Sequence, residues 1–367
     1  MKNIKRLIFF ILALSIQACF PADEDPVKVA PISGAILSPQ VGGAAQPNQV
    51  WIKLSDSTKS VNKRTDWDLA FYSGDEYRVI LNFSVMMGAG KIQNVTDIDA
   101  VKMSDVEDLM NKIYIAPQEP DTEKYIDDPA GHYLSQKTGI QEIKENNEEN
   151  PIYLINMGRD IYTGTILPGS SISGGESRGW KKIQIVRNGN NGYKIKYANI
   201  GETDHKEFII TKDADYHFQF FSMTSGKTVS IQPKKKNWDI AFTIFTNYGY
   251  DTSGVFQGGT YIYNDFVLIN IFSNVGAYQV NIPNGQNQND IYNQFKLNDV
   301  DVSKFIFNDQ RAIGDHWRTV TGNNGAQVFA DRFYVIKDAD GFFFKLRFSK
   351  MMKDGIRGHP EFEYEPL

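Results

Sequence analysis

The chain has 367 residues, of which 23% are charged and 13% are aromatic, and its formal net charge at pH 7 is −5. This acidic balance argues against a nucleic-acid partner and against docking on anionic lipid. Its single cysteine excludes an intramolecular disulfide framework and any zinc or iron–sulfur site built from several cysteines.

The first residues have the form of a bacterial lipoprotein signal. Residues 2–6 carry three positive charges, and the apolar stretch 7–14 that follows is too short to span a bilayer. Cys19 stands behind a small residue, Ala18, at the expected cleavage point, which resembles a lipobox with an acylated cysteine. We therefore predict a signal peptide over residues 1–18 and a lipid anchor at Cys19. The alternative is an ordinary signal peptide with a coincidental cysteine.

Residues 19–47 are acidic at first and then rich in Gly, Ala, Pro and Gln, which is typical of a flexible tether. The acidic cluster at residues 23–25 resembles an export signal for the outer face of the outer membrane, although a solvated linker explains it equally well. Cleavage after residue 18 removes three positive charges, so the formal charge changes from −5 to −8. We expect a protein that is anchored to the membrane through lipid only.

A repeated pentapeptide is the clearest internal pattern. Trp-Asp-Leu-Ala-Phe at residues 67–71 recurs as Trp-Asp-Ile-Ala-Phe at residues 238–242. A second match pairs the glycine turn and aromatic, basic run of residues 192–197 with residues 341–348. Two matches in the same order predict a tandem of two similar units.

We place the first unit at residues 48–212 and the second at residues 213–367. Aromatic residues and short alternating apolar runs predict an all-β fold, mainly antiparallel, with a few short helices. The predicted strands are residues 50–54, 77–81, 182–186, 217–221, 266–271 and 333–336.

One helix and one excursion are expected in the first unit. Ser104 and Glu107 have the spacing of a capping box, and the apolar residues that follow up to Ile113 recur at helical spacing. Residues 118–150 are polar and acidic with weak periodicity, so they are interpreted as an excursion or long loop.

Familiar catalytic motifs are missing from the sequence: it has no Gly-x-Ser-x-Gly elbow, no phosphate loop and no His-Glu-x-x-His. Asp68 and Asp239, within the repeated pentapeptide, could act as carboxylate bases. A residue fixed in both copies of a strand motif more often bonds to the backbone, so we favour a structural role. Glycines at residues 88–90 and 258–259 indicate bulges or close backbone approach, with a ligand cradle as the weaker alternative.

Several of these motifs together resemble the HmuY haem-binding lipoproteins. The pentapeptide of the second unit follows an aromatic strand and a Ser-Gly-Lys turn at residues 220–227, and the closing stretch 331–348 is followed by Phe-Glu-Tyr at 362–364. The resemblance covers the second unit and, more weakly, residues 50–210. It implies an all-β fold, a surface role in haem acquisition, and transfer of haem to a TonB-dependent outer-membrane receptor.

The resemblance also implies that two axial histidines or methionines hold the haem iron, and both are usual neutral haem ligands. The family's histidine a few residues beyond a tryptophan has no counterpart after Trp317, and residues 278–297 contain neither histidine nor methionine. The substitutes available in the sequence are His316, Met86, Met87, Met351 and Met352. His316 could equally be a polar turn residue, and one methionine of each doublet could fill the core.

The sequence therefore predicts a surface-exposed, lipid-anchored protein of the outer membrane that binds haem or a related tetrapyrrole and catalyses no reaction. A surface binding or adhesion module for a glycan, a peptide or a partner receptor is the first alternative. A surface hydrolase whose site is not visible in the sequence is the second.

Overall fold

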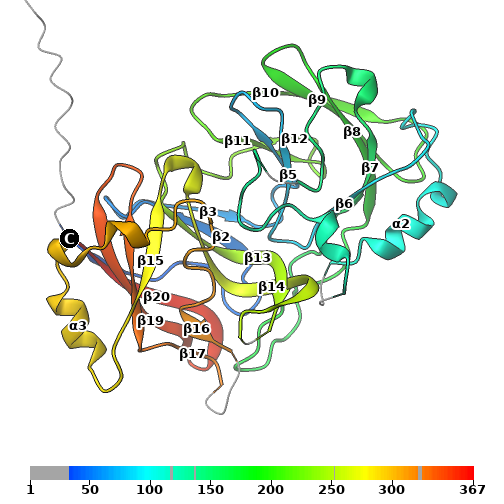
Figure 1. Ribbon diagram of the computed structural model, residues 1–367. Coiled ribbons are helices and arrows are strands. Elements are labelled where there is room, and N and C mark those ends of the chain that lie inside the picture. Colours follow the sequence, from blue (N-terminus) through cyan, green and yellow to red (C-terminus); the bar gives the residue numbers. More distant parts are fainter. Residues whose placement is uncertain (1–32, 116–118, 136–137, 252, 321–324) are drawn as a thin grey trace, which may run out of the picture. The chain divides into compact units, whose positions relative to one another are not determined.

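The computed structural model describes residues 33–115, 119–135, 138–251, 253–320 and 325–367 (Figure 1). The predicted signal peptide and Cys19 lie outside the described residues. None of the helices in the described part of the chain is long and apolar enough to cross a membrane. The fold is built from antiparallel sheets with few helical residues, as the sequence predicts.

The sheets form two lobes, and we call the first the middle lobe because it uses residues 67–231 from the middle of the chain. Its larger sheet has the order β10-β9-β8-β7-β6 and its smaller sheet the order β12-β11-β4-β5. The strands are β4 (Leu69–Tyr72), β5 (Val79–Leu81), β6 (Gly88–Lys91), β7 (Ile152–Asn156), β8 (Trp180–Arg187), β9 (Gly192–Asn199), β10 (Lys206–Thr211), β11 (Phe218–Ser222) and β12 (Lys227–Val229).

The second lobe, which we call the terminal lobe, joins residues 34–63 with residues 238–367. Its larger sheet has the order β1-β20-β19-β18-β15 and its smaller sheet the order β14-β13-β2-β3, and β16 and β17 form a separate pair. The strands are β1 (Ala35–Leu37), β2 (Asn48–Ile52), β3 (Lys59–Lys63), β13 (Ile240–Tyr250), β14 (Phe256–Ile269), β15 (Gly276–Asn281), β16 (Arg318–Thr319), β17 (Gln327–Val328), β18 (Arg332–Lys337), β19 (Phe343–Lys353) and β20 (Ile356–Pro366).

Helical segments are short and lie between strands. They are η1 (Met103–Asp105), α2 (Glu107–Lys112), η2 (Thr122–Tyr125), η3 (Asn147–Glu149), η4 (Ile271–Ser273), α3 (Gln288–Gln294), η5 (Leu297–Asp299) and η6 (Val302–Lys304). The predicted helix after residue 104 exists as η1 and α2, but the predicted cap is wrong. The Asp105 carboxylate accepts the backbone N–H of Lys102 at 2.8 Å, and no side chain caps α2.

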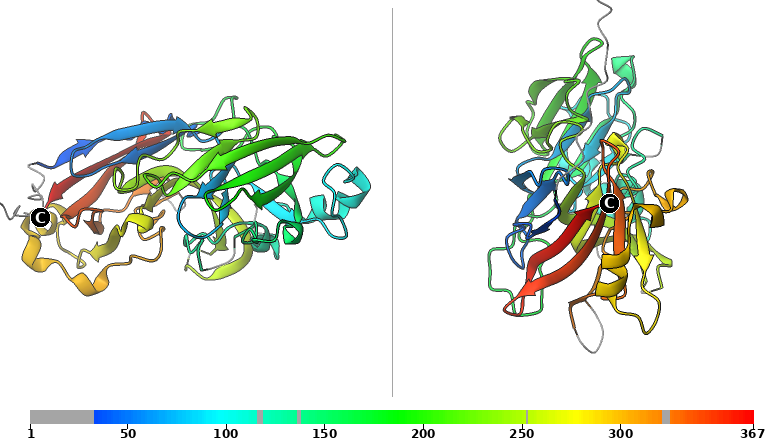
Figure 2. Two further views of the ribbon diagram at one scale, coloured as in Figure 1. Left: turned by 90° about the horizontal axis from the view of Figure 1, so that it is seen from above. Right: turned by 90° about the vertical axis from the view of Figure 1, so that its left-hand side faces the viewer.

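The lobes do not coincide with the units of the repeat. The hairpin β2–β3 belongs by sequence to the first unit but pairs with β13, while β11–β12 belongs to the second unit but pairs with β4. The strand just before each hairpin lies in the same lobe as that hairpin, because β1 joins the terminal-lobe sheet and β10 joins the middle-lobe sheet. In Figures 1 and 2 the blue β2 and β3 can be followed to their place beside β13.

The predicted tether is therefore wrong for residues 33–47. Ala35, Ile36 and Leu37 pair with β20, and Val41 is only 2% exposed in the terminal-lobe core. These apolar residues are spaced among Gly, Pro and Gln, which concealed a short edge strand.

Sheet order also corrects the second sequence match. Counting from β6 in one sheet and from β15 in the other, β8 corresponds to β19 and β9 corresponds to β20. Lys182 on β8 and Lys345 on β19 confirm this pairing, because both are buried and both ammonium groups donate to backbone carbonyls. The run after Gly192 therefore corresponds to β20, and its resemblance to residues 341–348 reflects strand composition.

Along both pentapeptides, successive side chains point to opposite faces of the small sheets and so contact different hydrophobic clusters. Leu69 and Phe71 face the core of the middle lobe, and the matching Ile240 and Phe242 face the core of the terminal lobe. The small residues between them, Ala70 and its counterpart, face a third cluster, which lies between the lobes. Successive strand residues point to opposite faces, so each small sheet is covered on both sides.

The repeated tryptophans are buried at equivalent positions, with exposed fractions of 0% for Trp67 and 5% for Trp238. The ring of Trp67 lies edge-on to Phe220 at 4.9 Å, and that of Trp238 lies edge-on to Trp51 at 4.8 Å. Each pair joins a tryptophan of one sequence unit to a hairpin of the other unit within a single lobe, so these contacts hold the exchanged hairpins in their lobes.

Residues 119–150 pack on the sheets although their composition is polar. Ile126, Tyr133, Ile140 and Ile143 are each at most 5% exposed. Gln310 reaches across from the terminal lobe and donates to the carbonyl of Pro129 at 3.0 Å. This excursion is thus part of the contact between the lobes.

Candidate functional site

Three of the five candidate ligands lie in the terminal lobe. His316 is exposed, and the ring of the next residue, Trp317, stacks on Phe348 of β19 with ring centroids 4.3 Å apart. Met351 and Met352 follow on the same strand. The Trp317–Phe348 contact therefore brings the loop of His316 and the strand of the methionine doublet together.

The two methionines of β19 differ in accessibility. Met351 is 2% exposed within the terminal-lobe core, whereas Met352 is partly buried at the edge of that core. The pairing of β19 with β20 is irregular on both sides of Lys350, so the strand changes register just before the doublet. The prediction that one methionine of the doublet faces inward is confirmed here.

Met86 and Met87 lie in the middle lobe, and the residues at the equivalent places of the terminal lobe indicate their roles. The run from Asn82 to Gly88 matches the run from Asn270 to Gly276, which pairs Met86 with Asn274 and Met87 with Val275. Met86 and Asn274 both have left-handed backbones, with φ of 64° and 59°. Met87 and Val275 are both buried, at 2% and 0% exposure. Met87 therefore fills the place of a core valine.

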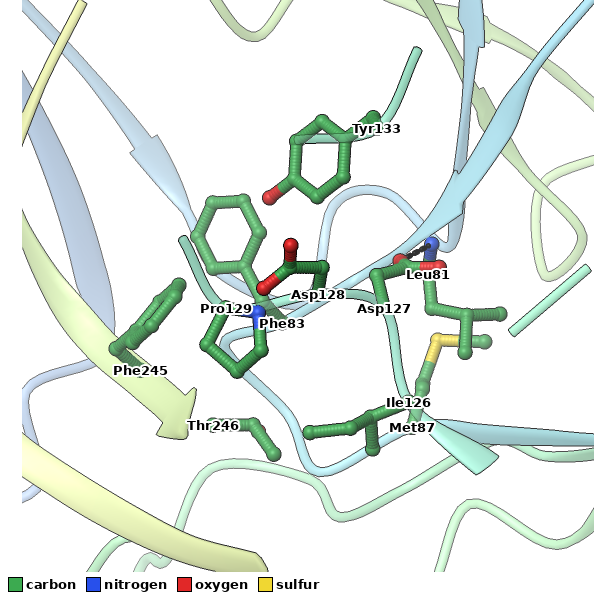
Figure 3. Close-up of a pocket in the computed structure, with 10 residues that line it drawn as sticks. All are labelled: Leu81, Phe83, Met87, Ile126, Asp127, Asp128, Pro129, Tyr133, Phe245 and Thr246. Carbon is green, nitrogen blue, oxygen red and sulfur yellow. Dashed lines mark hydrogen bonds between the residues drawn. The ribbon is translucent and has the colours of Figure 1, made fainter. Parts of the chain in front are cut away.

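Met87 also lines a small internal cavity of about 10 Å³ (Figure 3). Phe83, Tyr133 and Phe245 form part of its wall, and the side chain of Asp127 lies beside it. A cavity of this size has room for about one water molecule. Met87 consequently has no space for a macrocycle at its sulfur.

Asp127 fixes the excursion to the middle lobe at this cavity. Its two carboxyl oxygens accept the backbone N–H groups of Leu81 at 2.6 Å and Gly139 at 2.8 Å. Burial raises the pKa of Asp127 to about 7, against the lowering effect of these two N–H donors. The carboxyl group therefore changes charge near neutral pH while it holds two segments together.

Three of the four other histidines have side-chain partners, and the fourth, His359 on β20, is half-buried with no hydrogen bond from its imidazole to another described residue. His132 and His205 contact the carboxylates of Asp128 and Asp99 at 3.0 and 2.9 Å. His217 is buried and bonds through Nε2 to Ser273 Oγ at 2.8 Å, and burial lowers its pKa to about 4. No hydrogen bond joins the imidazole of His316 to another residue of the described chain.

The donor set fits haem only in part. His316 fits, because an exposed imidazole can approach an iron without moving the core. Met87 and Met351 do not fit as they stand, since each is 2% exposed within a core cluster. Of the five candidate iron ligands, His316 is therefore the accessible one, and Met352 and Met86 are partly accessible thioethers.

The glycine stretches have different roles. A Cβ atom on Gly90 would lie 2.8 Å from Ile113 and 2.9 Å from Leu109, so this glycine permits the close packing of α2. Gly258 and Gly259 have φ of 90° and 66°, which is backbone that favours glycine.

Exposed aromatics stand on both sides of the second glycine pair, and sequence reasoning did not single them out. Phe256 and Tyr261 are 48% and 40% exposed. Tyr248 and Tyr250 lie on the partner strand, with Tyr250 opposite Phe256. The signal available in the sequence was the alternation of Tyr at residues 248, 250, 261 and 263 around glycines. Within the described residues no group of three or more His, Cys, Asp or Glu side chains could hold a metal ion.

Comparison with known families gives one result. The family model described as HmuY protein matches the chain twice, at residues 45–211 and 214–364. A search of curated proteins finds none that matches this chain. The two matched segments agree closely with the two units of the repeat.

Proposed function

Because this chain belongs to the HmuY family, we propose that it is a surface-anchored outer-membrane lipoprotein that binds haem or a related tetrapyrrole for iron acquisition. The double family match carries this proposal, since it covers both units and the family is a haem-binding, non-enzymatic one. A TonB-dependent outer-membrane receptor is the partner that such a role requires.

Within this proposal His316 is the first ligand of the iron. Its imidazole is exposed, whereas His132, His205 and His217 are engaged with other side chains. Met352 is the second candidate, because it lies on the strand against which Trp317 packs. Haem bound there would supply an iron that accepts neutral imidazole or thioether donors.

The absence of catalysis is part of the proposal and rests on the roles of the most plausible carboxylates. Asp68 and Asp239 are both 0% exposed and both accept backbone N–H groups. Neither can reach a substrate without unfolding a hairpin.

The test is a haem titration of the purified protein, followed by visible absorption. We expect a saturable Soret band that differs from that of free haem and of haem with serum albumin. A spectrum that never departs from free haem would contradict the proposal.

The second candidate function is binding of a glycan, a peptide or a receptor at the β13–β14 hairpin. The specific observation in its favour is the pair of exposed rings, Phe256 and Tyr261, on both sides of the left-handed Gly258–Gly259. Exposed aromatic faces suit sugar rings and apolar anchors alike, and the Tyr261 hydroxyl adds a polar group beside them. A glycan array in which wild type binds and Phe256→Ala with Tyr261→Ala does not would favour this function over haem.

A further inference from the structure

The two lobes repeat one hydrogen-bonding scheme, which makes each a reference for the other. Asn82 Nδ2 donates to the carbonyls of Arg64 and Trp67, both at 2.7 Å. Asn270 Nδ2 donates to the carbonyls of Lys235 and Trp238 at 2.8 and 3.0 Å. These bonds show that Asn82 and Asn270, like the two tryptophans, occupy equivalent places.

In the middle lobe the remaining polar atoms of this scheme are satisfied by protein. The indole N–H of Trp67 donates to Gln49 Oε1 at 2.9 Å, across the contact between the lobes. Asn82 Oδ1 accepts the backbone N–H of Ser84 at 2.9 Å and its hydroxyl at 2.6 Å.

Around Trp238 and Asn270 both of these partners are replaced by phenylalanine. The pairing of β11 with β4 and of β2 with β13 puts Phe218 in the place of Gln49. Ser84 and Phe272 each lie two residues after the equivalent asparagine, so Phe272 takes the place of Ser84. The indole N–H of Trp238 and Oδ1 of Asn270 consequently have no hydrogen-bond partner in the described part of the chain.

The two residues that carry these unpartnered atoms line one cavity. Trp238 and Asn270 are 5% and 1% exposed, and both line a cavity of about 20 Å³ between the lobes. The rings of Phe218, Phe272 and Trp51 form much of its wall. About 10–15 Å³ is enough for one water molecule, so the cavity admits a ligand of that size and excludes larger ones.

The chemistry of the two atoms restricts the ligand. An indole N–H needs an acceptor, and an amide oxygen needs a donor. A halide ion only accepts hydrogen bonds and an ammonium ion only donates them, so neither serves both atoms. Burying either atom without a partner is unfavourable, and a ligand bonded to both would avoid this cost.

We propose that the terminal lobe carries an internal binding site for one small neutral molecule that both donates and accepts hydrogen bonds, of the size of water, held between Trp238 Nε1 and Asn270 Oδ1. The proposal goes beyond haem binding and does not depend on it. It also makes the two lobes functionally unequal, since Gln49 and Ser84 close the equivalent position beside Trp67.

The test is a water–protein cross-relaxation spectrum of the protein labelled with 15N-tryptophan. The variants Trp238→Phe and Trp67→Phe assign the two indole signals directly. If one of these variants does not fold, Phe variants of Trp51, Trp180 and Trp317 assign the two signals by elimination. We expect a direct cross peak with long-lived water at the indole proton of Trp238 and none at that of Trp67.

Tyr133 also lines the cavity, and its hydroxyl proton could relay such a signal. The control is therefore Tyr133→Phe, in which the Trp238 cross peak must persist. A missing cross peak at Trp238, equal peaks at Trp238 and Trp67, or loss of the peak in the Tyr133 variant would each overturn the proposal.

Discussion

Asp68 and Asp239 make equivalent hydrogen bonds, each to a hairpin that belongs by sequence to the other unit. The Asp68 carboxylate accepts the backbone N–H of Met223 at 2.7 Å, and the Asp239 carboxylate accepts that of Leu54 at 2.8 Å. Each aspartate thereby fixes the turn of a hairpin that belongs, by sequence, to the other unit. Each also has a buried cationic partner, Arg178 for Asp68 and Lys53 for Asp239.

The first prediction concerns these aspartates. Asp68→Ala should lower the free energy of unfolding by roughly 3–5 kcal/mol, because it leaves the buried guanidinium of Arg178 without its carboxylate. Urea unfolding measures the loss. The matched control is Asp75→Ala, which removes an exposed carboxylate nearby and should stay within about 0.5 kcal/mol of wild type. Equal stability of the two variants would contradict a structural role for the pentapeptide.

The second prediction concerns the limits of the lobes. A fragment of residues 62–234 holds both middle-lobe sheets and should fold cooperatively. Residues 213–367 should not, because that fragment lacks β1, β2 and β3 and leaves the inner edge of β13 unpaired. Far-UV circular dichroism and urea unfolding of each fragment provide the measurement.

A permutant supplies the control for the second fragment. Residue 35 pairs with residue 364, so the ends of the terminal lobe are adjacent. A chain that runs from 235 to 367 and continues through a short linker into 33–63 restores the missing strands and should fold. Cooperative unfolding of 213–367 alone would show that the sequence units, not the lobes, are the folding units.

The third prediction is a pH dependence at Asp127. Its pKa is raised to about 7 in the folded protein, above the value near 3.9 of an unfolded aspartate. The folded state therefore keeps a proton that the unfolded state releases, so this contribution to stability is full below pH 4 and is lost as pH rises to about 7.

Asp127→Asn mimics the protonated group and should not show this loss. The difference in unfolding free energy between wild type and Asp127→Asn should fall by roughly 1–3 kcal/mol between pH 4 and pH 7. This is less than the full shift allows because the residue keeps some exposed surface. A difference that stays constant, or that grows with pH, would mean that Asp127 is ionised throughout.

The fourth prediction concerns the anchor. Cys19→Ala should release the protein from the membrane fraction and abolish incorporation of labelled fatty acid, because two or more acyl chains are needed for stable anchoring. The membrane fraction and the label are measured together. Retention of the variant in the membrane, with its label intact, would refute lipidation at this residue.

Much of the fold could be predicted from the sequence because its signals are local. Alternating apolar runs placed the strands around residues 50, 80, 184, 219, 268 and 335, and the repeated pentapeptide indicated the tandem. The lobes could not be predicted, because nothing in β2 or β11 states which copy's strand each will pair with. Both hairpins meet nearly identical pentapeptide strands, so the choice is made by the whole fold.

The candidate site was predicted less well, for a related reason. The methionine doublets look alike in sequence, yet burial separates Met351 from Met352 and Met87 from Met86. The replacement of Gln49 by Phe218 acquires meaning only when Trp67 and Trp238 are seen to be equivalent. Local sequence patterns carry no information on partners that lie in the other lobe.

The most direct test of the haem assignment is the visible spectrum of the haem complex for wild type, His316→Ala and His205→Ala. His205 is the matched control, because it is a histidine of the middle lobe that is paired with Asp99. We predict that His316→Ala shifts the Soret band or weakens haem binding at least tenfold, while His205→Ala reproduces the wild-type spectrum and affinity. Identical spectra and affinities for all three proteins, or no binding by wild type, would contradict haem coordination through His316.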